Sequence, residues 1–145
     1  ENYVASDLYK TLPKNKLKEM QFALPVDDLL VSGVVDCVVE TDDGLLLVDY
    51  KTGRPPKQDE VKLGYAYQLA IYKYAVEKLL NKKVIEAKLH FLQNLSEWSM
   101  PMDKDYLDAS LALCNEIRSK AKEEDFTCNL ANCKYCPYNY LCPQK

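Results

Sequence analysis

The chain has 145 residues, a formal net charge of −3, 48% hydrophobic residues and 28% charged residues. This length and composition suit one globular domain with a core of its own, and the charge excludes a protein that binds nucleic acid through overall charge alone. The apolar runs are too short to cross a bilayer and no signal-peptide pattern is visible, so we expect a cytoplasmic protein without membrane contact. Because the sequence opens at Glu1 without a methionine, we also expect a fragment of a larger protein.

Hydrophobic periodicity and turn residues predict alternating strands and helices along the chain. In order, we expect the end of a helix over residues 4–12, strands over 18–26, 31–40 and 45–51, a helix over 61–80, strands over 84–92 and 97–100, and a helix over 104–124. Asp103 is the expected cap of the last helix. The TDDG sequence at residues 41–44 predicts a tight hairpin. The order predicts an α/β layer fold whose mixed sheet contains an antiparallel hairpin flanked by helices.

Two aspartates and one lysine lie on the predicted hairpin, at Asp36, Asp49 and Lys51. Strand residues two apart point to the same face of a sheet, so Asp49 and Lys51 share a face. If Asp42 and Asp43 form the turn, Asp36 lies directly across from Asp49. If the turn is one residue later, Asp36 faces Lys51. Either register places the three side chains on one face.

The predicted neighbours on that face are apolar, namely Val34, Val38 and Leu47. Two carboxylates among them would repel each other and be poorly hydrated, at a cost on the order of several kcal/mol. A magnesium or manganese ion between the carboxylates would remove this cost, and Lys51 beside it would hold an attacking water or stabilise phosphate charge. The alternative is a structural ion pair between Lys51 and one aspartate, because a D-x-K triplet is common.

Three segments of the chain resemble the motifs of RecB-family nucleases of the PD-(D/E)XK kind. Residues 33–36 (GVVD), 48–52 (VDYKT) and 68–72 (QLAIY) are similar, in order, to the G-x-x-D, D-Y-K-T and Q-x-x-x-Y motifs of that family. Residues 19–22 (EMQF) resemble a glutamate-then-phenylalanine stretch that precedes the first motif in many members. The resemblance extends from Glu19 to the C-terminus and implies a restriction-endonuclease-like core.

By this resemblance the chain is a hydrolase that cuts DNA phosphodiester bonds with bound Mg²⁺ or Mn²⁺. Asp36 and Asp49 would be the metal ligands, with the carbonyl of Tyr50 as a third. Lys51 would position or activate the attacking water.

The resemblance also assigns roles to residues outside the hairpin. Gln68 would orient Lys51 or the substrate, and Tyr72 would line the DNA path; four residues apart, they share a helix face. Glu19 is a further candidate catalytic residue. Many relatives carry a metal-binding histidine on an upstream helix, whereas the one histidine here, His90, lies in a predicted strand and is expected to be a core or edge residue.

Four of the six cysteines lie near the C-terminus, which indicates a metal or iron–sulfur site in a reducing compartment. Their C-x-x-C-x5-C spacing resembles the tail of AddB-like nucleases and CRISPR-adaptation exonucleases, which holds a [4Fe–4S] cluster with a distant upstream cysteine. Here Cys128 is the alternative fourth ligand, and zinc is the alternative metal. The cysteines of this tail are Cys128, Cys133, Cys136 and Cys142, whereas Cys37 and Cys114 are expected to be small core residues. We expect a nuclease core at residues 1–126 and the tail at 127–145, in one domain.

We therefore expect a Mg²⁺-dependent DNA exonuclease or endonuclease module of a helicase–nuclease in DNA repair or recombination. Its partners would be DNA and a helicase domain, in the same chain or in a partner subunit. Two other classes remain: a non-catalytic, cluster-stapled DNA-binding or scaffold domain, and a zinc-binding interaction module. The clustered lysines are either solvated surface or a modest phosphate-contacting strip, so DNA binding should be weak and salt-dependent.

Overall fold

The computed structural model describes residues 16–55, 63–103, 105–124, 133 and 136–142. The helix end expected over residues 4–12, and Cys128, lie outside this part. The chain divides into two compact units, Glu1–Ala112 and Leu113–Lys145. Of the described helices, none is long and apolar enough to span a membrane.

The described part contains five strands and two helices, which match the elements predicted from the sequence to within a few residues. In chain order they are β1 (Lys16–Val26), β2 (Leu29–Thr41), β3 (Gly44–Lys51), α2 (Leu63–Leu80), β4 (Val84–Phe91), β5 (Ser96–Ser99) and α3 (Tyr106–Lys122). The predicted mixed sheet with flanking helices is confirmed.

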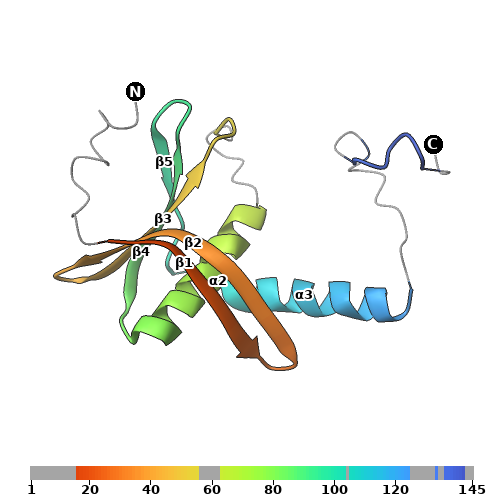
Figure 1. Cartoon of the computed structure of the whole chain (residues 1–145), viewed down its shortest axis with the longest axis horizontal. Helices are drawn as coiled ribbons and strands as arrows, with labels where there is room; N and C mark the ends of the chain where they lie inside the picture. The colour runs from red at the N-terminus through yellow and green to blue at the C-terminus, as the bar shows by residue number, and fades with distance from the viewer. Residues whose placement is uncertain (1–15, 56–62, 104, 125–132, 134–135, 143–145) are drawn as a thin grey trace. The chain divides into compact units, whose positions relative to one another are not determined.

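The five strands form one sheet in the order β1-β2-β3-β4-β5. Neighbouring strands are antiparallel except β3 and β4, which are parallel and are connected through α2. A parallel pair needs a crossover of this kind, and α2 lies across one face of the sheet (Figure 1). The end of β3, which carries Asp49 and Lys51, therefore lies beside α2.

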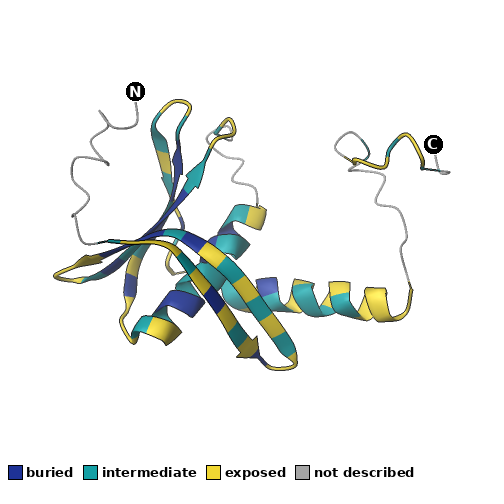
Figure 2. Cartoon of the chain, viewed as in Figure 1, coloured by how far each residue is buried: buried dark blue, intermediate teal, exposed yellow. Residues whose placement is uncertain are grey.

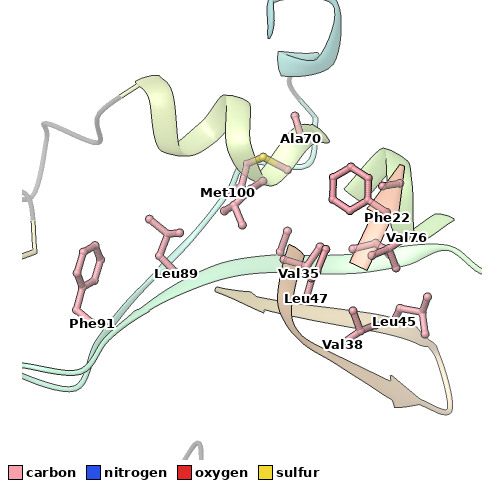
Figure 3. Packing of buried hydrophobic residues seen from close by; sticks show 14 residues of the cluster. Phe22, Val35, Val38, Leu45, Leu47, Ala70, Val76, Leu89, Phe91 and Met100 are labelled. Atoms are coloured by element: carbon pink, nitrogen blue, oxygen red, sulfur yellow. The ribbon is translucent and has the colours of Figure 1, made fainter. Parts of the chain in front are cut away.

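The main core is the layer between this sheet face and α2, and its side chains come from β1 to β4 and from α2 (Figure 3). On α2 the buried residues are Ala66, Leu69, Ala70, Ala75 and Val76. Leu63 and Leu79, which helical spacing also suggests for the core, are 55% and 46% exposed. A helix this rich in tyrosine and alanine shows apolar residues on several sides, so periodicity alone does not select the buried stripe.

The β2–β3 hairpin turns at Asp42 and Asp43, with Thr41 paired to Gly44 and Cys37 paired to Val48. This is the first of the two registers left open by the sequence, the one that places Asp36 opposite Asp49. Regular pairing between the two strands ends at Cys37 and Val48, so Asp36 lies just beyond the last paired residue of β2.

The alternation of side chains along β2 is interrupted at Asp36. Val35 and Val38 both belong to the main core although they are three residues apart, and Val34 is 42% exposed. Val34 therefore does not share a face with Val38, contrary to the expectation. The β1–β2 register is continuous except at the pair Glu19 and Asp36, and Glu19 has a φ of 51°. Both strands change face at this one pair.

Helix α3 begins at a different cap from the expected one. The Asp105 side chain accepts hydrogen bonds from the backbone N–H groups of Leu107 (3.1 Å) and Asp108 (3.4 Å). Asp105, not Asp103, is thus the N-cap, because only its carboxylate is one residue before the first turn. In α3, exposure rises toward the C-terminal half (Figure 2).

Candidate active site

Asp49 and Lys51 lie at the end of β3 on the face that packs against α2. Leu47, two residues earlier on the same face, is fully buried, and Asp49 is only 2% exposed. The ammonium Nζ of Lys51 lies 2.6 Å from Asp49 Oδ2. Two-residue strand periodicity therefore places a buried carboxylate and a lysine side by side, as the sequence predicts.

Burial raises the pKa of the Asp49 carboxyl above its ordinary value of 3.8. Lys51 lowers this pKa through its hydrogen bond and its charge, and the nearby charge of Asp36 raises it further. Burial outweighs the lysine, so Asp49 is a carboxylate that lacks sufficient positive charge around it. A second cation at this point would be favourable.

Lys51 is linked to α2 through a chain of hydrogen bonds. Its Nζ donates to Oε1 of Gln68 at 2.8 Å, and Nε2 of Gln68 donates to the hydroxyl of Tyr72 at 2.9 Å. Gln68 and Tyr72 are one helical turn apart and face the sheet together. The structure thus brings four of the predicted site residues into one continuous polar chain, from Asp49 to Tyr72.

The ring of Tyr72 is held by two residues of the β1–β2 hairpin. Phe22 packs edge-on against Tyr72, with 5.9 Å between ring centroids. A Cβ atom at Gly33 would lie 2.9 Å from the Phe22 ring and 3.5 Å from the Tyr72 ring. An alanine at position 33 would therefore force the Phe22 ring to shift, whereas its contact with the Tyr72 ring would be of ordinary length.

Asp36 approaches the same site from β2. Its Oδ2 accepts a hydrogen bond from the backbone N–H of Tyr50 at 2.8 Å, and Tyr50 lies between Asp49 and Lys51. The interruption at Asp36 frees its side chain from regular strand packing, so the carboxylate can bond to the neighbouring backbone.

Glu19 lies beside Asp36 but is exposed, and its backbone is left-handed. With Asp36, Cys37 and Tyr50 it lines a cavity of about 240 Å³. In the described part of the chain, Glu19 does not join Asp36 and Asp49 in a three-carboxylate metal site. Its catalytic role remains a prediction.

A family model of the PD-(D/E)XK nuclease superfamily matches residues 3–143, nearly the whole chain. The chain belongs to the PD-(D/E)XK nuclease superfamily. The motif resemblance that assigns roles to Asp36, Asp49 and Lys51 concerns this same superfamily.

The curated relatives of this superfamily member are much longer proteins. An ATP-dependent helicase/nuclease subunit from Pelotomaculum thermopropionicum is 45% identical over 71 residues, which are 48% of this chain and 6% of that protein. The protein of the same name from Moorella thermoacetica is 40% identical over 88 residues, or 61% of this chain and 6% of that protein. This chain therefore spans less than a tenth of the relatives it matches.

A solved structure has a similar fold. The crystal structure of SSO0001 superposes with a TM-score of 0.58 and 18% sequence identity, and the match covers 95% of this chain and 66% of that chain. At this identity the likeness concerns the fold alone.

His90 does not occupy the position of a metal ligand on an upstream helix. It is 1% exposed in the interior strand β4, where its Nδ1 lies 3.3 Å from Glu97 Oε1 and its ring packs edge-on against Tyr50. The expectation that His90 is a strand residue of the core is confirmed.

The cysteines of the nuclease chain fall in three settings. Cys37 is buried, and burial raises the pKa of its thiol, with a smaller opposite effect from a hydrogen bond to Tyr50. Cys114 is only partly buried on α3. The expectation of a buried core position is therefore confirmed for Cys37 and wrong for Cys114. Among the described residues, no three His, Cys, Asp or Glu side chains are grouped as a metal site, and the described tail cysteines are Cys133, Cys136 and Cys142. The AddB-like cysteine cluster therefore stays a prediction.

One residue near the site was missed by the motif comparison. The ring of Tyr65 lies under the ammonium of Lys51, with 5.0 Å between Nζ and the ring centroid. Tyr65 precedes Gln68 by three residues, so it shares the helix face of Gln68. The three-residue spacing between Tyr65 and Gln68 could have predicted that Tyr65 lies near the site.

Proposed function

We propose that this chain is a nuclease module that hydrolyses DNA phosphodiester bonds with the help of a divalent cation. The observation that carries the proposal is the partly buried polar chain from Asp49 through Lys51 and Gln68 to Tyr72, with Asp36 beside it. A purely structural ion pair would need neither the second carboxylate nor the hydrogen-bonded glutamine. The superfamily membership agrees with a nuclease.

The residues present fit a hard divalent cation, magnesium or manganese. Asp36 and Asp49 offer carboxylate oxygens, and the backbone carbonyl of Tyr50, the residue after Asp49, offers a third oxygen. Burial and the mutual repulsion of the two carboxylates raise the pKa of Asp49, and a bound cation would offset both effects. When bound, such a cation polarises a phosphoryl oxygen and lowers the pKa of a coordinated water.

The chain's own residues would orient the reactants and stabilise charge. The positively charged side chain of Lys51 lies close to Asp49 and is 20% exposed. A phosphate could therefore approach its ammonium from solvent. The side-chain oxygen of Gln68 accepts a hydrogen bond from the ammonium and so restricts where Lys51 can point. Fixed in this way, Lys51 would stabilise the negative charge that develops on the phosphate and would hold an attacking water.

The contacts of Tyr72 favour a positioning role over a place in the DNA path. Its hydroxyl accepts a hydrogen bond from Gln68, and its ring packs against Phe22. Tyr72 thus sets the amide orientation of Gln68, which presents its oxygen to Lys51.

The names of the relatives support a wider setting. The matched proteins are called ATP-dependent helicase/nuclease subunits. We propose that this module likewise works beside a helicase on DNA, in repair or recombination.

A [4Fe–4S] cluster or a zinc ion on the cysteine tail is a separate proposal. Anaerobic purification followed by iron and zinc analysis tests it. Brown protein with broad absorbance at about 400 nm is expected for the cluster, and colourless protein with neither metal bound would contradict both.

A cleavage assay with matched lysine variants tests the nuclease proposal. Linear DNA is incubated with the chain in Mg²⁺ and in excess EDTA, for the wild type, Lys51→Met and Lys73→Met. Lys73 forms an ion pair with Glu77 on α2, where both side chains are partly exposed, so it controls for the loss of one positive charge. We expect Mg²⁺-dependent cleavage by the wild type and Lys73→Met, and loss of about 10²-fold or more for Lys51→Met. Folded wild-type protein that binds DNA but never cuts it would favour the scaffold alternative.

A further inference from the structure

Tyr65 lies where the end of β3, the end of β4 and the first turns of α2 meet. Lys51 and Phe91 are register partners on the parallel strands β3 and β4. The Tyr65 ring contacts both of them: its centroid is 5.0 Å from Lys51 Nζ and 6.5 Å from the Phe91 ring, with an edge-on angle of 67°. Phe91 is 1% exposed, so the surface that supports Tyr65 is a rigid part of the core.

The ammonium of Lys51 therefore has three partners of different kinds. These are the carboxylate of Asp49 at 2.6 Å, the amide oxygen of Gln68 at 2.8 Å and the π face of Tyr65. A cation within about 6 Å of a ring centroid is attracted by the negative face of the ring. Because the lysine side chain is only 20% exposed, solvent weakens this attraction less than at an open surface.

The three partners respond differently to a divalent cation at the site. A cation held by Asp49 would compete with Lys51 for that carboxylate and would repel the ammonium. The Tyr65 ring carries no net charge and is not a ligand for magnesium, so its attraction for Lys51 would persist. The same holds for Gln68, whose oxygen already accepts from Lys51.

We propose that Tyr65 is a positioning residue of the active site, which holds the Lys51 ammonium in place through the face of its ring. This inference rests on the proposed nuclease function for its role in catalysis, but the coupling between Tyr65 and Lys51 is a property of the metal-free protein. The ring face, not the hydroxyl, carries the effect. Phenylalanine at position 65 should therefore serve, and leucine should not.

The kinetic test compares Tyr65→Phe, Tyr65→Leu and the matched control Tyr67→Leu. Tyr67 lies two residues away on α2 and its ring packs against Tyr106, with 6.4 Å between the centroids. We expect Tyr65→Phe to stay within about twofold of the wild-type kcat, and Tyr65→Leu to lose about two- to thirtyfold in kcat with little change in KM, the range that cation–π attraction spans. An unchanged kcat for Tyr65→Leu, or an equal loss for Tyr67→Leu, would overturn the proposal.

Fluorinated phenylalanines at position 65 provide variants of nearly constant shape that keep the fold. Each added fluorine withdraws electron density from the ring face, so kcat should fall stepwise from phenylalanine to the trifluoro ring. A purely packing role for Tyr65 predicts no such trend, and its absence counts against the proposal.

A double-mutant cycle on unfolding separates this inference from the proposed function. Tyr65→Leu, Lys51→Met and the double variant are unfolded in denaturant with EDTA present, so that neither cleavage nor metal enters the measurement. We expect the effects on the unfolding equilibrium constant to be non-additive by about twofold or more. Additive effects would refute the Tyr65–Lys51 coupling even in an active nuclease. In a folded protein that does not cleave DNA, measured coupling would leave the Tyr65–Lys51 contact standing, whereas the absence of cleavage would refute the nuclease proposal and the catalytic role of Tyr65.

Discussion

The two strands that meet at the site hold their carboxylates in opposite ways. On β3 the alternation is regular, so Asp49 and Lys51 face α2 together, and Asp49 is held by charge. On β2 the alternation breaks at Asp36, and a hydrogen bond from the backbone of Tyr50 holds this carboxylate. A regular strand, such as β3, presents alternate residues to one face. The interruption in β2 lets Asp36 turn its carboxylate toward the backbone of β3, at Tyr50.

This difference extends to the energetics of the two aspartates. Asp49 is buried and has its pKa raised, so the charge that makes it a good metal ligand also destabilises the metal-free fold. Asp36 is half-buried and gains a charge-assisted hydrogen bond in the same state. We therefore expect substitutions at Asp36 and Asp49 to reduce activity to a similar extent but to change the stability of the protein differently.

The largest expected effect is common to both carboxylates. Asp49→Asn and Asp36→Asn should each reduce Mg²⁺-dependent cleavage of linear DNA by about 10³-fold, because an amide is a poor magnesium ligand and lacks the charge that offsets the cation. Initial rates at saturating DNA measure this. Near-wild-type activity of either variant would show that the cation binds elsewhere.

The next largest effect on activity is expected at Gln68 on α2. Gln68→Leu should lower kcat by about ten- to a hundredfold, because Lys51 loses the oxygen that restricts its position. Gln68→Glu keeps an acceptor for Lys51 but loses the donor to Tyr72, and so should be less impaired. If Gln68→Leu and Gln68→Glu lose equal activity, the hydrogen bond that Gln68 accepts from Lys51 does not explain its effect on kcat.

A smaller effect, on stability, is expected at the glycine beneath the aromatic pair. Gly33→Ala would place a Cβ 2.9 Å from the Phe22 ring, and we expect the free energy of unfolding to fall by about 1–3 kcal/mol. Gly53→Ala is the matched control, since a Cβ there meets no atom within 4 Å. Urea unfolding followed by circular dichroism measures both. Equal stability of the two variants would mean that the rings over Gly33 can shift freely.

The smallest effect is the pH dependence of metal-free stability. The folded pKa of Asp49 is raised, so the folded state binds its proton more tightly. The contribution of Asp49 to stability therefore falls as pH rises from below about 4, the unfolded value, through the folded value. Asp49→Asn lacks this group, so its stability relative to the wild type should rise over that window, by at most about 1.4 kcal/mol per pH unit. Denaturant unfolding in EDTA at several pH values measures the slope. A relative stability that is flat or falls with pH would contradict the raised pKa.

Local periodicity in the sequence determined much of the candidate site. The two-residue repeat of a strand placed Asp49 beside Lys51, and the four-residue spacing on a helix placed Gln68 beside Tyr72. The turn residues restricted the hairpin to two registers, both of which brought Asp36 close to the motif on β3. These relations depend only on neighbours within one or two elements, so they can be read before the fold is known.

Tertiary structure decided what depends on contacts between distant segments. Pairing of β1 with β2 sets the change of face at Glu19 and Asp36, which the valine-rich sequence of β2 does not reveal. The packing of α2 on the sheet selected which of its many apolar residues are buried, and it placed Tyr65 under Lys51. A strand or helix repeats its own geometry, but the position of an interruption, and of one ring against one ammonium, is set by the shape of the partner surface.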